Sequence, residues 1–328
     1  MDFIAIGDTV VDEFIKLKEA HVSYDVNHVD RILSMPFAAK IPYVSSIIVP
    51  AVGNAANAAV AAARLGISTA FVSNVGKDRA GEEILAAFTR EGVDTTYIAI
   101  NDSIPTNHHY VLSFQTERTI LIRHEKYPYI IPEGLPAPKW IYLSSVGEHS
   151  GDFHDSLAKW LKEHSETKLA FQPGTFQIEM GKEKLAVIYS SSEVVACNKE
   201  EAEKILDLGE TDIKELLEKM RSLGPKIALI TDGPNGAFVS DGTETLKVPM
   251  YPDTKPPIDR TGAGDATTST FVAALALGKS LSEALLWGPV NSMSVVQHTG
   301  AQKGLLTREA LEKYLADAPK EYRVESLS

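Results

Sequence analysis

Short apolar runs alternate with amphipathic or alanine-rich segments along most of this chain, and this alternation restricts the fold more than any other feature. The runs at 3–7, 69–76 and 95–100 have strand character, and the intervening segments 54–66 and 80–92 have helix character. A strand, a helix and another strand in succession form a unit whose two strands lie parallel. We therefore expect an α/β fold with a mainly parallel central sheet and helices on its faces.

The same alternation resumes in the second half of the chain. Candidate strands, with helical segments between them, lie at 139–145, 168–174, 193–198 and 226–233. A polar hairpin is expected next, and the last third is mostly helical, at 263–277, 280–297 and 307–316. The single cysteine, Cys197, falls near the end of an expected strand, so we expect a buried, unreactive thiol in a reducing compartment.

Residues 101–135 break this rhythm. The stretches 108–114 and 118–125 alternate in polarity around a short turn, which is typical of a β-hairpin. Together with 12–17 and 45–50, the hairpin is expected to form a small separate sheet that acts as a lid.

Length and charge narrow the classes of protein. A chain of 328 residues is reasonable for one large α/β domain with an appendage, and no linker divides it. We expect one domain over 1–328, with its lid formed by about 12–50 and 101–130. The net charge of −12 argues against partners held through phosphate contacts, such as nucleic acid, and against an anionic membrane surface. The acidic N-terminus is unlike a signal peptide, and no apolar run reaches ~18 residues, so we expect a cytoplasmic protein.

The stretch DRTGAGD at 259–265 ends where a long helical segment begins. The first N–H groups of a helix lack intrahelical partners and carry about half a positive charge. Gly262 and Gly264 would let an anion approach these groups closely, which predicts an anion hole at Gly262, Ala263 and Gly264. Asp265 in the first turn would lie beside the anion, where it could accept a proton from an attacking hydroxyl.

Simpler interpretations of this motif remain open at this stage. The glycines could serve only close helix packing, and Asp265 could serve only as a helix cap. Two other phosphate-binding patterns fail on spacing, because Thr267 and Ala273 stand where a dinucleotide fingerprint and a P-loop would each need a glycine.

The motif resembles the C-terminal signature of the ribokinase-like (PfkB) sugar kinases. Further stretches resemble other motifs of that family in the family's order, namely GNAANAA at 53–59 with NVGKDRAG at 74–81, NKEE at 198–201, TDGPNG at 231–236 and HTGAQKG at 298–304. The resemblance implies a three-layer αβα sandwich with a central, mostly parallel sheet and a small β-sheet lid. It also implies an ATP-dependent carbohydrate kinase, a phosphotransferase with an alcohol group as acceptor.

The resemblance also assigns roles by position. Asp265 matches the catalytic base, and the anion hole falls on Gly262, Ala263 and Gly264. The substrate-binding positions are Asp12, Gly53 and Asn57, and the ATP-binding positions are Asn198, Thr231, Gly233, Gly236, Gly262 and Gly264. Asn198 and Glu201 match the motif that organises Mg²⁺, largely through water. Many members hold K⁺ at the positions of Asp259, Thr261, Gly300 and Gly304.

Elementary chemistry permits these roles and does not require them. A carboxylate such as Asp12 can accept two O–H groups of a vicinal diol, and Mg²⁺ prefers few carboxylates together with waters and phosphates. A solvated strand residue at Asp12, a first-turn helix acid at Glu201 and an ordinary turn at Thr231 to Gly233 remain the alternatives.

The sequence departs from the family pattern where the acceptor would bind. Val52 stands where a second glycine is usual, and its bulk would narrow or reshape the sugar pocket. Arg260 replaces a small residue beside the anion hole. In the hairpin, Arg118 and Arg123 could bind the phosphate of a sugar phosphate. His108 and His109 lie on opposite faces of the expected strand, so one of them could face the sugar. Solvated or structural roles are preferred for all four residues.

We therefore expect ATP to donate its γ-phosphoryl group to a hydroxymethyl group of a small carbohydrate. A nucleoside kinase of the same fold is the alternative, favoured if Phe37, Tyr43 or Tyr110 formed an apolar pocket for a base. A non-catalytic regulator that binds sugar or nucleotide is the second alternative. A homodimer through the lid is a further expectation, because a small sheet has open edges.

Overall fold

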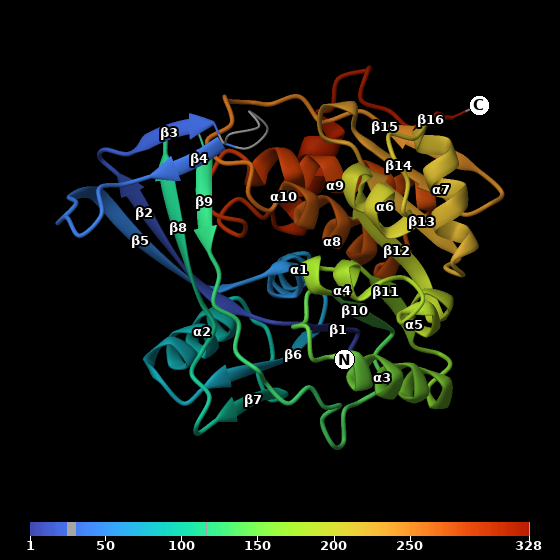
Figure 1. Ribbon diagram of the computed structural model, residues 1–328. Coiled ribbons are helices and arrows are strands. Elements are labelled where there is room, and N and C mark those ends of the chain that lie inside the picture. The colour runs from blue at the N-terminus through green and yellow to red at the C-terminus, as the bar shows by residue number, and fades with distance from the viewer. Residues whose placement is uncertain (25–30, 116, 328) are drawn as a thin grey trace.

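A long sheet runs through the molecule, with helices on both faces and a smaller sheet to one side (Figure 1). The computed structural model describes residues 1–24, 31–115 and 117–327. In spatial order the strands of the large sheet are β16 (Glu325–Ser326), β15 (Thr245–Val248), β14 (Ala237–Ser240), β13 (Ile227–Thr231), β12 (Ser192–Asn198), β11 (Lys168–Phe171), β10 (Trp140–Leu143), β1 (Phe3–Ile6), β6 (Thr69–Gly76) and β7 (Ile98–Asn101). Neighbours are parallel from β7 to β13 and antiparallel from β13 to β16.

The helices cover the sheet in two layers, each with its own hydrophobic core. One face is covered by α1 (Asn54–Arg64), α2 (Arg79–Arg90), α8 (Ala263–Ala276), α9 (Leu281–Val295) and α10 (Arg308–Ala316). The other face is covered by α3 (Gly151–Glu163), α4 (Thr175–Met180), α5 (Ala186–Ser191), α6 (Lys199–Leu206) and α7 (Ile213–Ser222). The strand β1 is buried throughout because both faces are covered, which explains its continuous apolar sequence.

The small sheet has the order β5 (Tyr43–Val52), β2 (Val10–Leu17), β8 (His108–Phe114) and β9 (Glu117–Leu121). The separate sheet expected from these stretches is therefore present. A two-stranded ribbon, β3 (His21–Tyr24) with β4 (Arg31–Ser34), was not predicted. Within the predicted lid, residues 25–30 lie outside the described part of the chain, and the second hairpin strand ends at Leu121 and not at 125.

The expected α/β arrangement is confirmed. The predicted strands and the three helices of the last third all appear, with ends shifted by only a few residues. Cys197 lies buried in β12, and burial raises the pKa of its thiol, so the thiol is unreactive as expected. Among the described residues, no helix combines the length and the apolar character that crossing a membrane requires.

The carboxyl ends of the parallel strands meet at one edge of the sheet, where α1 and α8 also begin. Asn198 at the end of β12 pairs in register with Thr231 at the end of β13. Ligands of open parallel sheets bind outside this edge. The helices α1 and α8 pack against each other there, because α1 presents small alanine side chains.

Arg64 fixes the far end of α1. Its guanidinium makes two hydrogen bonds of 2.7 Å to the carboxylate of Glu91, and it donates at 2.8 Å to the carbonyl oxygens of Gln302 and Leu305. The helix is thereby tied to the segment that leads into α10.

We expect Arg64→Met to lower the free energy of unfolding by about 2–3 kcal/mol, because it strands the Glu91 carboxylate and removes a donor from two carbonyls. The matched control Arg79→Met breaks the exposed pair with Glu83 and should cost less than about 1 kcal/mol. Hydrogen bonding to Arg64 lowers the pKa of Glu91, so this stabilisation is present at neutral pH and is lost as the pH falls through that lowered pKa. Urea denaturation measures both variants, and equal losses would contradict the assignment.

Candidate active site

The first turn of α8 is built for close approach to its backbone. Gly262 precedes the helix with φ of +78°, and a Cβ atom there would lie 2.4 Å from the Cβ of Ala301, so only glycine fits. No side chain caps the turn. A Cβ on Gly264 would meet nothing within 4 Å, so this side of the turn is open. Close packing therefore explains Gly262, and neither packing nor capping explains Gly264 and Asp265.

Two cavities flank this turn. The Met293 cavity, of about 230 Å³, is lined by Ala263 and Gly264. The Asp12 cavity, of about 200 Å³, is lined by Thr261 and Asp265. Because consecutive residues of one turn line both cavities, the turn is their common wall.

The carboxylate of Asp265 is held by two side-chain amides. Asn57 donates to Oδ2 at 2.8 Å, and Gln172 donates to Oδ1 at 3.0 Å. Both amides are themselves oriented, because Gln302 donates to Asn57 at 3.0 Å and the hydroxyl of Tyr142 donates to Gln172. Burial raises the pKa of Asp265, while the hydrogen bonds from Asn57 and Gln172 oppose that rise. The result is a fixed carboxylate with more basic character than usual.

Gln172 was missed by the sequence analysis. It follows β11 directly, at the carboxyl end of a buried parallel strand, and that position is the only signal that could have pointed to it. Asn57 was predicted to bind substrate, and the structure places it both in the lining of the Asp12 cavity and on the Asp265 carboxylate.

Polar groups in the Asp12 cavity lack partners. Asp12 and His109 face each other in register across β2 and β8, with the Oδ1 and Nδ1 atoms 3.3 Å apart. The Oδ1 atom of Asp12 and the Nε2 atom of His109 are buried without a hydrogen bond from the described residues. A buried polar atom without a partner costs free energy, so both atoms are placed for a polar ligand. Gly53, also predicted here, lines the cavity with φ of +126°.

Asp8 is a second acid of this cavity that the sequence analysis overlooked. It is only 3% exposed, and the hydroxyl of Tyr129 lies 2.9 Å from both of its carboxylate oxygens. The Nδ1 atom of His124 lies 3.5 Å from the same carboxylate. Burial raises the pKa of Tyr129, and the charge of Asp8 adds to that rise, so the hydroxyl remains a donor.

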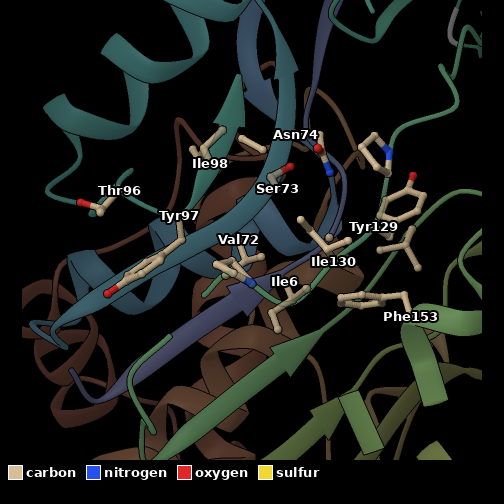
Figure 2. A pocket seen from close by; sticks show the side chains of 15 residues that line it. Ile6, Val72, Ser73, Asn74, Thr96, Tyr97, Ile98, Tyr129, Ile130 and Phe153 are labelled. Carbon is tan, nitrogen blue, oxygen red and sulfur yellow. The ribbon is translucent and has the colours of Figure 1, made fainter. Parts of the chain in front are cut away.

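Tyr129 also lines a third cavity, of about 220 Å³ (Figure 2). The lining of this third cavity includes Tyr129, Ile130 and Phe153, together with residues of β6 and β7. Asp265 does not line it. The ring of Tyr129 thus faces one cavity while its hydroxyl holds an acid of the other.

Four of the six predicted nucleotide residues line the Met293 cavity, whereas Asn198 and Gly262 do not. Thr231, Gly233 and Gly236 line it, together with apolar residues that include Met250, Pro257, Met293 and Val296. Arg260, a departure from the family pattern, is exposed and lines this cavity as well.

Asn198 and Glu201 form a capping box at the start of α6. Oδ1 of Asn198 accepts from the Glu201 N–H at 2.8 Å, and Oε2 of Glu201 accepts from the Asn198 N–H at 2.9 Å. Burial raises the pKa of Glu201, and the nearby charge of Asp265 raises it further. The first-turn structural role is therefore present, and the two acids are close enough to repel each other.

Three of the four predicted cation ligands come together beside the anion hole. The carboxylate of Asp259 accepts from the N–H of Thr261 at 2.9 Å and of Gly300 at 3.0 Å. Arg118 of β9 donates to the same carboxylate at 2.5 Å and also to the hydroxyl of Thr261. Burial would raise the pKa of Asp259, but the hydrogen bonds from Thr261 and Gly300 lower it below its usual range.

Gly304, the fourth predicted ligand, lies against the end of α9, where a Cβ would be 2.4 Å from the carbonyl oxygen of Ser294. Its position is thus explained by close packing. Val52 lines the Asp12 cavity, as its predicted effect on the pocket requires. Arg123 pairs with Glu125 at 2.7 Å.

Comparison with known proteins identifies relatives of this chain. Residues 19–308 match the family described as pfkB family carbohydrate kinase. Ribokinase of Haemophilus influenzae is 28% identical over 276 residues, which cover 81% of this chain and 87% of that protein.

Solved structures share the fold at lower identity. The nucleoside kinase of Methanocaldococcus jannaschii has a TM-score of 0.80 at 20% identity, covering 96% of this chain and 98% of its own. Arabidopsis thaliana ribokinase complexed with ribose and ATP also has a TM-score of 0.80, at 21% identity and with the same coverage. The expected ribokinase-like fold is thereby confirmed.

The two glycines of the turn should respond in opposite ways to alanine. Gly262→Ala should lower the free energy of unfolding by at least about 2 kcal/mol, because it adds both a steric clash and a left-handed backbone penalty. Gly264→Ala has room for its methyl group and lies within a helix, so it should be neutral or stabilising by up to about 1 kcal/mol. Urea denaturation of both variants is the measurement, and a similar loss in each would show that the turn is packed on both sides.

Proposed function

The chain belongs to the pfkB family of carbohydrate kinases, and we propose that it transfers the γ-phosphoryl group of ATP to a hydroxymethyl group of a small carbohydrate. Membership makes it a phosphotransferase with an alcohol group as acceptor. The observation that supports the specific proposal is the turn from Gly262 to Asp265, which separates two cavities while presenting uncapped amides and a fixed carboxylate. An acceptor on one side and a terminal phosphate on the other would meet at this turn.

Each side of the turn would contribute one part of the chemistry. Asp265 would accept the proton of the acceptor hydroxyl, and its raised pKa suits a general base. The amides of Ala263 and Gly264 would stabilise the charge that develops on the transferring phosphoryl group. The Met293 cavity, with Thr231, Gly233 and Gly236 at its rim and apolar side chains inside, would hold the nucleotide.

The residues on the phosphate side fit a magnesium ion. Burial and the charge of Asp265 raise the pKa of Glu201, so a divalent cation between Glu201 and the phosphates would relieve an unfavourable concentration of negative charge. We propose that Glu201 and Asn198 hold Mg²⁺ largely through water. When bound, the ion would neutralise charge on the phosphates. The potassium site does not fit as well, because the carboxylate of Asp259 is already paired with Arg118.

The charges of the Asp12 cavity favour an uncharged acceptor. Asp8, Asp12 and Asp265 line it, and no lysine or arginine is among the described residues that do so. The two hairpin arginines, which could have bound a phosphate, are paired elsewhere, Arg118 with Asp259 and Arg123 with Glu125. We therefore propose a free sugar as the substrate, because a phosphate on the acceptor would meet like charge.

A nucleoside acceptor stays the alternative, since a nucleoside kinase shares the fold. The aromatic residues that would have formed a base pocket do not favour it. Phe37, Tyr43 and Tyr110 are 100%, 57% and 43% exposed, and none lines the Asp12 cavity.

We further propose that the chain is one domain over 1–328, in which the small sheet, from about 12–50 and 101–130, acts as a lid that excludes water. The edge strand β5 exposes Tyr43, Val44, Ile47 and Ile48, which supports a homodimer through the lid. The net charge of −12 supports the absence of nucleic-acid and membrane partners. The single cysteine, with its free buried thiol, supports a reducing, cytoplasmic location.

Asp265→Asn should lower kcat by about 10²–10⁴-fold, because the amide cannot accept the proton. ATP binding should persist, and the variant should unfold at an equal or lower temperature, because the new NH2 group would face one of the two amides that donate to Asp265. ADP release, calorimetric ATP binding and thermal unfolding measure the three effects. In the parent enzyme kcat/KM should rise with pH through the raised pKa of Asp265. The matched control is Glu148→Gln, which alters an exposed acid paired with His149 and should keep kcat near the parent value. An Asp265→Asn variant with near-parent kcat would reject the general-base role.

The acceptor can be identified by ADP release with ribose, fructose, fructose 6-phosphate and adenosine. We expect kcat/KM for a free sugar to exceed that for its phosphate by at least about a hundredfold, because the cavity is acidic. Asp12→Asn should raise KM for that sugar by about tenfold or more. Faster turnover of fructose 6-phosphate would refute the uncharged-acceptor proposal, and preference for adenosine would establish the nucleoside alternative.

A further inference from the structure

Arg118 links the small sheet to the turn that leads into the anion hole. It comes from β9, yet its Nη1 atom donates at 2.5 Å to Asp259 and also contacts the hydroxyl of Thr261. We propose that this guanidinium is the resident cation of the turn at Asp259–Thr261, so that the protein needs no dissolved monovalent ion there. The lid would then supply a charge that orders the anion hole, a consequence that rests on the proposed kinase function.

The conformation of the turn at Asp259–Thr261 depends on the carboxylate of Asp259. Asp259 holds the N–H of Thr261 and the N–H of Gly300, which belong to two separate loops. The N–H groups of Ile258 and Asp259 both donate to the carbonyl oxygen of Val296, at 2.8 and 3.1 Å. Gly262, which precedes α8, directly follows Thr261 in the chain. The position of Asp259 therefore sets the direction in which the α8 amides point.

A positive partner stabilises the Asp259 carboxylate in addition to the hydrogen bonds from Thr261 and Gly300. The Asp259 side chain is only 12% exposed, and a carboxylate removed from water is costly without a compensating charge. A guanidinium remains charged at any physiological pH and presents several donors in one plane, so it can bind the carboxylate and the Thr261 hydroxyl together. A potassium ion would need the same oxygen atoms, and the two cations would compete for one place.

The origin of Arg118 couples this charge to the lid. Arg118 belongs to β9 of the small sheet and lies 141 positions from Asp259 in the chain. The small sheet must therefore lie over the turn for the Arg118 side chain to reach Asp259. A lid that moved away would withdraw the charge from the turn. The anion hole would thus be fully ordered only while the acceptor cavity is covered.

The test compares Arg118→Met with the parent chain in choline chloride and in potassium chloride at equal ionic strength. Thermal unfolding and ATP turnover with an accepted sugar are both measured. The parent should respond to the exchange of salts by less than about twofold. Arg118→Met should lose about tenfold to a hundredfold in kcat in choline and regain most of it in potassium, because the ion can enter the vacated place.

Two further variants serve as controls. Arg118→Lys retains a charge and should stay largely independent of potassium. Arg123→Met removes an arginine of the same lid segment that pairs with Glu125, and it should behave as the parent does. Potassium should raise the unfolding temperature of Arg118→Met and leave those of the parent and of Arg123→Met unchanged.

The proposal is overturned if the parent itself requires potassium, if Arg118→Met equals the parent in choline, or if potassium restores neither its rate nor its unfolding temperature. The unfolding temperatures do not depend on turnover. A chain that phosphorylates no acceptor would therefore reject the proposed function while the comparison of salts still decides the role of Arg118.

Discussion

The backbone amides at the start of α8, which no side chain caps, are the constraint on which the rest of the site depends. A helix end without a cap is unfavourable unless something else meets its N–H groups. In this protein no side chain caps the turn, and Gly262 is pressed so closely against Ala301 that the direction of the amides is fixed. The flanking cavities, the fixed carboxylate of Asp265 and the paired Asp259 are all arranged around that one exposed helix end.

Negative charge is distributed around this turn in an uneven way. The side toward the small sheet has Asp8 and Asp12, which suits the hydroxyl groups of an uncharged ligand. Glu201, in the first turn of α6, is a further acid near Asp265, and its raised pKa reflects both burial and that proximity. Arg118, the arginine that reaches the turn from the small sheet, is paired with Asp259. Its charge therefore meets a carboxylate of the turn and does not face the Asp12 cavity.

Much of the architecture could be predicted because each central strand is buried on both faces, and a continuous apolar run such as that of β1 is a strong local signal. The ribbon of β3 and β4 was missed because its exposed residues lack that signal. In the site, the glycine-rich turn was readable from local sequence. Gln172, Asp8 and Arg118 were not, because their roles arise from contacts with residues far away in the chain. Asp259 was assigned to a cation site from local sequence, and no local pattern could have shown that it pairs with Arg118, 141 positions away in the chain.

The parallel pairing of β2 with β8 has a consequence for how the chain acquires its shape. Asp12 lies beside His109, and the chain between them includes the strands β6 and β7 of the large sheet and the helices α1 and α2 that cover it. Contacts between such distant segments form slowly, because the entropy of closing a long loop is lost before the contacts contribute stabilising free energy. We therefore expect the small sheet to complete its pairing late in folding, once the large sheet has brought β2 and β8 together.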